Sequence, residues 1–129
     1  MKYTYTALLT PDQDRTYYCS VPDLPGCITT GNSLNEAIDM ITDAASIWLV
    51  GAEDDHDPIP EPTPQEKLDH SEGTILTLIR VDSIKYRASI DTHAVRKNVS
   101  LPAWMARLAD EKGFNCSQIL QESLLAKFG

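Results

Sequence analysis

The side chains best suited to metal chemistry stand in one consecutive run, Asp54-Asp55-His56-Asp57. Carboxylate and imidazole groups are common ligands of divalent cations. Consecutive residues of an extended loop do not converge on one ion, however, and the surrounding stretch is itself strongly acidic. The run therefore indicates a solvated acidic loop with no metal or other cofactor. His70 and His93 have no carboxylate or cysteine at a helpful spacing, so we expect surface histidines.

The cysteines Cys19, Cys27 and Cys116 are odd in number and show no Cys-x-x-Cys spacing. This pattern argues against a disulfide scaffold or a zinc ribbon and favours a reducing cytoplasm. Cys27 follows a tight turn and could react, but a small buried hydrophobic residue is the preferred interpretation. The chain has no signal-peptide pattern and no apolar run of the roughly 18–20 residues that span a membrane. We therefore expect a cytoplasmic protein without membrane contact.

The chain has 129 residues, 42% of them hydrophobic, which is enough for one ordinary domain or two small ones. Residues 3–9 are aromatic and β-branched with two-residue alternation, and they predict a strand. Residues 16–21 predict a second strand, paired with the first in a hairpin, and residues 27–30 a short third one. Residues 74–81 have strong β propensity and predict a further strand.

A helix is expected between the third and fourth strands. Ser33-Leu34-Asn35-Glu36 has the pattern of a capping box, in which the serine and glutamate side chains satisfy free amides of the first turn. Apolar residues then recur at helical spacing from Leu34 to Val50, and Gly51 is expected to end the helix. The single apolar face predicts packing against one side of the sheet.

Charge divides the chain unevenly. Residues 1–81 carry 14 acids and 4 bases, a net of -10, and residues 82–129 carry 5 acids and 7 bases, a net of +2; together they give -8. Residues 51–73 hold eight of the acids and four alternating prolines, which predicts an extended surface loop. The acidic body should attract a basic partner, whereas the basic C-terminal part could approach a polyanion.

The C-terminal part begins after a poorly patterned connector, residues 82–95. Residues 96–101 alternate and predict a strand, and two short helices follow, separated by Gly113 as a left-handed cap. Asn115 or Ser117 can cap the second helix. One strand and two short helices cannot bury a sufficient core, so this part must pair with a second copy or dock elsewhere.

The turn after the second strand carries a recognisable motif, Tyr18-x-x-Val21-Pro22-Asp23-Leu24-Pro25-Gly26-Cys27-x-Thr29-x-Gly31, followed by Glu36-Ala37. This motif resembles the signature of the HicB antitoxin family. The later segments Ile75–Val81, Tyr86-Arg87 and Arg96–Pro102 resemble the rest of that family. The last of them, with Gly113–Ser117, is similar to ribbon-helix-helix DNA-binding modules, so the resemblance covers nearly the whole chain.

The resemblance implies an α+β fold with three parts. Residues 1–81 would form a small βββαβ partial RNase H-like toxin-binding domain that includes the acidic, proline-rich loop 51–73. Residues 82–95 would be a connector, and residues 96–129 a ribbon-helix-helix (strand-helix-helix) module for dimerisation and DNA binding.

The implied function is that of an antitoxin in a type II HicA/HicB-like toxin-antitoxin system. Such a protein neutralises a small basic HicA-like ribonuclease toxin by direct binding and represses its own operon by binding operator DNA. Charge alone gives the candidate toxin contacts Asp23, Glu53, Asp54, Asp55 and Asp57.

In a ribbon-helix-helix dimer, two antiparallel strands enter the major groove. Alternation then directs Arg96, Asn98 and Ser100 toward the bases. The start of the second helix would offer amides to a phosphate at Asn115, Cys116 and Ser117. The expected dimer core comprises Val99, Leu101, Met105, Leu108, Ile119, Leu120 and Leu124. The expected assembly is a homodimer or a dimer of dimers.

Other interpretations stay open. The ribbon could be an ordinary dimerisation strand, because it is only modestly basic and Lys97 lies in its inward set. The Pro22–Gly26 motif could simply form a rigid turn with a buried leucine. The chain could also be a solitary HicB-like regulator without a toxin. An RNase H-type nuclease needs clustered carboxylates for two metals, and residues 3–9 contain none, so we expect no catalytic residue and no enzyme.

Overall fold

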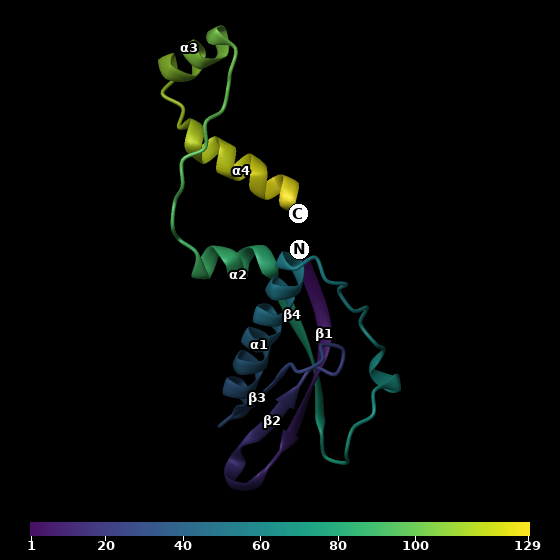
Figure 1. Cartoon of the computed structure of the whole chain (residues 1–129). Helices are drawn as coiled ribbons and strands as arrows, with labels where there is room; N and C mark the ends of the chain where they lie inside the picture. Colours follow the sequence, from purple (N-terminus) through teal and green to yellow (C-terminus); the bar gives the residue numbers. More distant parts are fainter. The chain divides into compact units, whose positions relative to one another are not determined.

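The computed structural model describes residues 1–129 and shows two compact units (Figure 1). The first unit is Lys2–Ile90. The second is Asp91–Gly129, with which Met1 is grouped. No helix combines the length and the apolar character that crossing a membrane requires.

The first unit contains one four-stranded antiparallel sheet in the order β3-β2-β1-β4. Its strands are β1 (Lys2–Pro11), β2 (Tyr17–Ser20), β3 (Ile28–Gly31) and β4 (Ile75–Asp82). The expected hairpin is confirmed, with Leu9 opposite Cys19, and β4 pairs on the other side of β1, with Ile79 opposite Tyr5. All four strands were predicted from the sequence to within about two residues.

Helix α1 (Leu34–Asp54) starts at the predicted cap, where the Ser33 side chain accepts a hydrogen bond from the Glu36 amide at 3.1 Å. The predicted end at Gly51 is wrong. Gly51 is helical, and the helix continues because Ala52 packs into the interior. The helix ends where His56 adopts a left-handed conformation with φ of 55°.

The core lies between α1 and one face of the sheet (Figure 1). It combines the alternate residues of β1 with the apolar face of the helix, as predicted. Its buried members are Tyr5, Ala7, Leu9, Cys19, Val21, Leu24, Cys27, Ala37, Ile41, Ala45, Leu49, Ile79 and Val81. The expectation of a buried Cys27 is confirmed, and burial raises the pKa of its thiol, which disfavours the reactive thiolate.

A helix that the sequence did not predict, α2 (Ser83–Ile90), occupies most of the expected connector 82–95. The Asp82 carboxylate begins it by accepting hydrogen bonds from the amides of Ile84 and Lys85, both at 3.1 Å. Since α2 belongs to the first unit, the division between the units falls after Ile90 and not after residue 81. No apolar stripe marks α2 in the sequence, because polar contacts from Ser83 and Arg87 hold the helix in place.

The second unit contains α3 (Ala103–Glu111) and α4 (Cys116–Phe128). The expected end of α3 and the expected cap of α4 are confirmed. Gly113 has φ of 68°, and the Asn115 side chain accepts a hydrogen bond from the Gln118 amide at 3.0 Å. Residues 91–102 form neither helix nor strand within the chain, so the strand expected at 96–101 is absent here. A strand needs a hydrogen-bonded neighbour, and this unit offers none.

The approach of β3 to α1 leads to a testable prediction at Gly31. A Cβ atom there would lie 2.5 Å from the Ala37 Cα atom, inside any allowed contact. We expect Gly31→Ala to lower the free energy of unfolding by about 1–3 kcal/mol, as overpacking does. Urea unfolding followed by circular dichroism measures this change.

The matched control is Gly51→Ala, because a Cβ atom at Gly51 meets nothing within 4 Å. This helical position should gain about 0.5–1 kcal/mol. Equal stability of Gly31→Ala and the wild type would contradict the close approach of strand and helix.

Candidate functional site

The turn between β2 and β3 holds the proline-rich segment in place. Asp23 accepts two hydrogen bonds from Thr63, one from its backbone amide at 3.0 Å and one from its hydroxyl at 2.5 Å. Tyr5 donates its hydroxyl proton to the Pro60 carbonyl at 2.5 Å. The rigid turn with a buried leucine is confirmed, since Leu24 is buried at its centre. Asp23, which has no obvious partner in the sequence, therefore has a structural partner forty residues along the chain.

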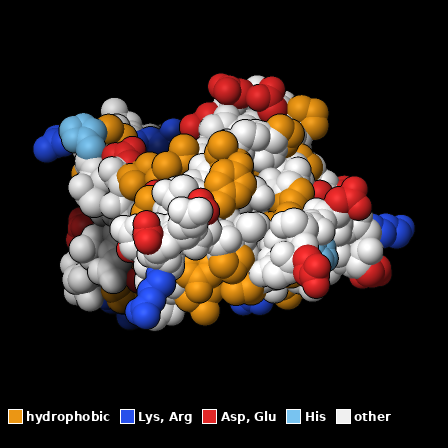
Figure 2. Space-filling view, turned by 90° about the horizontal axis from the view of Figure 1, so that it is seen from below, with side chains coloured by type: hydrophobic (Ala, Val, Ile, Leu, Met, Phe, Trp, Pro, Cys, Tyr) orange, Lys and Arg blue, Asp and Glu red, His pale blue; other side chains and the backbone are white.

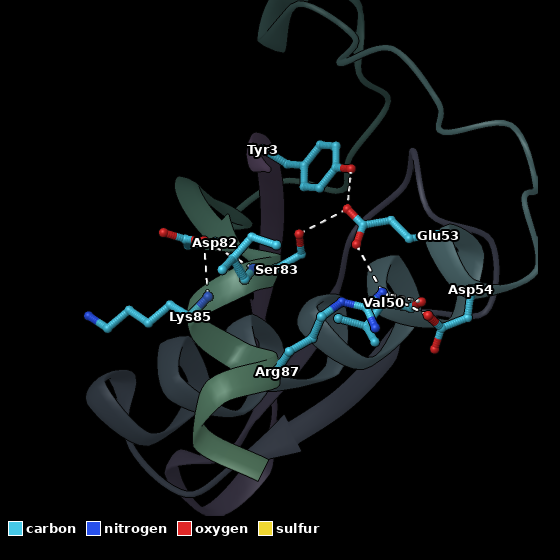
Figure 3. A network of polar contacts seen from close by, with 9 residues as sticks. Tyr3, Val50, Glu53, Asp54, Asp82, Ser83, Lys85 and Arg87 are labelled. Atoms are coloured by element: carbon cyan, nitrogen blue, oxygen red, sulfur yellow. Dashed lines mark hydrogen bonds and ion pairs between the residues drawn. The ribbon is translucent and has the colours of Figure 1, made fainter. Parts of the chain in front are cut away.

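A second network converges on the Glu53 carboxylate near the end of α1 (Figure 3). Tyr3 from β1 and Ser83 from α2 donate their hydroxyl protons to Oε2 at 2.5 and 2.9 Å. Arg87 of α2 donates to Oε1 at 3.1 Å and also pairs with Asp54 at 2.8 Å. One carboxylate thus joins β1, α1 and α2.

The network changes the acidity of its members. Partial burial by itself would raise the pKa of Glu53, but hydrogen bonds from Tyr3, Ser83 and Arg87 outweigh burial and lower it. Burial, followed by the hydrogen bond to Glu53, raises the pKa of Tyr3 to about 12. At neutral pH, Glu53 is therefore ionised and Tyr3 is a neutral donor.

The other predicted acidic contacts are open to solvent. Asp55 and Asp57 are exposed, and Asp54 is exposed although it pairs with Arg87. No group of three or more His, Cys, Asp or Glu side chains is placed to hold an ion. Of the five candidates, Asp23 and Glu53 accept hydrogen bonds within the unit, whereas Asp54, Asp55 and Asp57 lie on the surface.

The solvent face of α1 is a candidate surface that the sequence reasoning missed. Met40 and Ile47 are exposed on it, and the exposed acids Glu36, Asp39 and Asp43 surround them. The whole helix contains no lysine or arginine. Figure 2, which views the molecule from below, shows hydrophobic side chains beside acidic ones on the surface seen from that side. The sequence contained a sign of this surface, because Met40 and Ile47 are apolar but do not share the helical spacing of the buried residues of α1.

The second unit exposes its apolar side chains. No residue from 91 to 129 is buried, and six of the seven expected core residues are 40–58% exposed, with only Leu120 half-buried. Five of the seven line a groove of about 400 Å³ together with Phe114, namely Val99, Leu101, Met105, Ile119 and Leu120. These five are thus brought together around a space that the single chain does not fill, whereas Leu108 and Leu124 lie outside its lining.

The expected DNA contacts are all exposed. Arg96, Asn98 and Ser100 lie on the segment that precedes α3. Cys116 and Ser117 lie in the first turn of α4, next to the capping side chain of Asn115. The structure keeps each group available to a ligand, and Asn115 also serves the helix itself.

The chain matches a known protein family along nearly its whole length. A family model described as "HicB_like antitoxin of bacterial toxin-antitoxin system" matches residues 5–127. The chain belongs to this antitoxin family. A UPF0150 protein of Thermoplasma acidophilum is 33% identical over 67 residues, which is 52% of this chain and 97% of the relative. A UPF0150 protein of Synechocystis sp. is 36% identical over 59 residues, 46% of this chain and 75% of the relative.

Solved structures share the fold along the whole chain. A chain from a toxin-antitoxin complex of Streptococcus pneumoniae superposes with a TM-score of 0.63 at 23% identity, covering 98% of this chain and 99% of that one. The antitoxin HicB of Burkholderia pseudomallei gives 0.56 at 18% identity, with coverages of 98% and 99%. The α+β arrangement of a small antiparallel sheet with helices is therefore that of HicB antitoxins.

The lowered pKa of Glu53 generates a prediction about pH. A carboxyl whose pKa falls on folding stabilises the folded state above its unfolded pKa, and this contribution is lost as pH falls through the folded pKa. We expect Glu53→Gln to lower the free energy of unfolding by about 1–3 kcal/mol at pH 7. The difference from wild type should shrink as the pH falls below about 4.

Urea unfolding between pH 3 and pH 7 measures this difference, with Glu66→Gln as the control on an exposed acid. A loss at Glu53 that stays the same at every pH would mean that the carboxylate charge contributes nothing.

Proposed function

We propose that this protein is the antitoxin of a type II HicA/HicB-like toxin-antitoxin pair. The unit Lys2–Ile90 binds and neutralises a small basic ribonuclease, and the unit Asp91–Gly129 dimerises, binds operator DNA and represses the operon. The observation that carries the proposal is the family match, because residues 5–127 extend across both units. A similar chain occurs in the toxin-antitoxin complex of Streptococcus pneumoniae, which supports a toxin partner.

The charge of the first unit supports a basic partner. Residues 2–90 hold fifteen acids and six bases, and Arg87 is already paired within the unit. Asp23 and Glu53 are engaged internally and Asp54 already pairs with Arg87, so we assign the contact mainly to the exposed Asp55 and Asp57 together with the solvent face of α1. Acids there would speed association, and Met40 and Ile47 would supply apolar contact.

The toxin prediction is tested with a fragment of residues 1–90, since the buried core and both polar networks lie within it. The fragment should bind the basic ribonuclease encoded beside its gene and rescue growth, and association should slow as salt rises. Asp43→Lys combined with Ile47→Lys should weaken binding at least tenfold.

The matched control, Glu72→Lys, changes an exposed acid away from α1 and should keep most of the affinity. Equal loss in both variants would remove α1 from the interface. A folded fragment that binds no neighbouring gene product would favour the alternative of a solitary HicB-like regulator.

The second unit supports a dimer because it has no core of its own. A second copy would pair its segment 96–101 with this one and cover the groove around Leu101. We expect a dimer, or a dimer of dimers, by light scattering at micromolar concentration. Leu124→Asp should dissociate or unfold this unit, because its charge would be buried without a partner.

The control is Gln121→Asp, which adds the same charge at an exposed polar position of α4 and should leave the assembly intact. A stable wild-type monomer at micromolar concentration would contradict the paired strands.

Operator binding is expected to depend on the outward residues of the paired segment. Arg96→Ala and Asn98→Ala should each cost about 1–3 kcal/mol per base contact and relax specificity at particular base pairs. Ser117→Ala should weaken all sequences alike, since phosphate contacts carry no sequence information. Two-fold symmetry predicts an inverted repeat in the chain's own promoter.

Fluorescence anisotropy on promoter DNA at fixed salt measures these losses, with Lys127→Ala as the control for charge alone. Unchanged affinity in the Arg96→Ala, Asn98→Ala double variant, with the dimer intact, would exclude the paired segment from DNA binding.

A further inference from the structure

The last strand of the first unit, β4, has one open edge. The sheet order β3-β2-β1-β4 places β4 at the border of the sheet, and β1 is its only strand neighbour. No backbone hydrogen bond joins Ile75–Asp82 to a loop. In an antiparallel pair, every second residue points its amide and carbonyl away from the partner strand. The open edge of β4 therefore presents a row of backbone donors and acceptors.

This edge lacks the features that usually prevent strand pairing. Edge strands are commonly protected by shortness, by proline or lysine, or by a bulge. The opposite edge strand, β3, has only four residues. In contrast, β4 has eight residues without proline or lysine, and its register with β1 is continuous from the Lys2–Asp82 pair to the Leu9–Ile75 pair. The edge of β4 is thus long, regular and unprotected.

Apolar side chains accompany the open edge on the sheet face that points away from α1. Alternation places Leu76 and Leu78 on this face, because Ile79 and Val81 are buried on the other. The proline-rich segment 51–73 shares a hollow with Leu78, yet 63% of this residue stays exposed. Leu78 also lies near the middle of the strand. A strand that pairs with β4 would therefore gain apolar contact as well as backbone hydrogen bonds.

The two ends of β4 differ in charge, which indicates the partner. The exposed acids Asp69 and Glu72 precede the strand, whereas the exposed bases Arg80 and Lys85 lie at its other end. Asp82 also lies there, but its carboxylate caps α2. An antiparallel second copy of β4 would bring the acidic end of each strand to the basic end of the other. A basic toxin would meet like charge at Arg80 and Lys85.

We propose that the β4 edges of two copies pair antiparallel and join two first units into one continuous sheet. Such a pair is two-fold symmetric, so each copy contributes the same surface and Leu78 lies beside its own copy at the centre. With the pairing of the second unit, the assembly is a dimer of dimers. The inference deepens the proposed function by naming the second interface, and only the count of four copies rests on that proposed function.

Light scattering on the full-length protein at micromolar concentration tests this pairing. The wild type should contain four copies. Leu78→Lys should contain two, because like charges would face each other at the centre of the paired strands. The matched control is Ile28→Lys, which places the same charge at a similarly exposed apolar position of β3 and should still contain four.

A second variant keeps the test valid if circular dichroism shows that Leu78→Lys unfolds. Asp69→Lys with Glu72→Lys changes only exposed positions before the strand. It should raise the dissociation constant of the paired first units at least tenfold, because basic ends would then meet basic ends. Unchanged association of this double variant would overturn the proposed alignment.

Leu124→Asp separates the two interfaces, because it removes the pairing of the second unit. This variant should remain a dimer through β4, and adding Leu78→Lys should make it a monomer. A monomeric Leu124→Asp variant, a Leu78→Lys variant with the mass of the wild type, or equal dissociation by Ile28→Lys would overturn the pairing of β4. A dimeric wild type that Leu78→Lys alone makes monomeric would instead contradict the proposed dimer of the second unit.

Discussion

Three elements of the first unit meet on the carboxylate of Glu53. Tyr3 reaches it from β1, and Ser83 and Arg87 reach it from α2, so the ends of the sheet and of both helices are tied at one point. A partly buried charge is tolerable only when its hydrogen bonds replace water, and here three donors do so. Because α2 has no continuous apolar stripe, this polar contact determines where the first unit ends.

The acids of this unit consequently have different tasks. Asp23 and Glu53 hold loops and helices in place, and Asp82 starts α2. The acids Glu36, Asp39 and Asp43 of α1, and Asp55 and Asp57 after it, remain in solvent and contribute to the unit's negative surface. The net charge of the sequence does not distinguish these two groups of acids, because an acid with an internal partner and an exposed acid contribute the same formal charge.

The two units differ in whether they bury their own apolar side chains. The first packs one helix on one face of a sheet and buries Leu9, Ile41 and Leu49 completely. The second has helical signals, a cap and a left-handed glycine, but only two short helices and no sheet of its own. Its apolar residues surround an unfilled groove, which is the physical reason to expect association.

The sequence by itself determined the local features: four strands, the Ser33 and Asn115 caps, the Gly113 cap, the buried face of α1 and the family motif. These features depend on hydrophobic periodicity and on contacts between residues a few positions apart, and both can be recognised in the sequence. The motif also identified the family correctly.

Only the tertiary structure decided the rest. Helix α2, the extension of α1 past Gly51 and the roles of Asp23 and Glu53 all depend on partners 30–50 residues away. A strand at 96–101 would need a second chain, so neither the sequence nor the single chain supplies its partner. Contacts between distant residues follow from how the chain folds, and no local pattern encodes them.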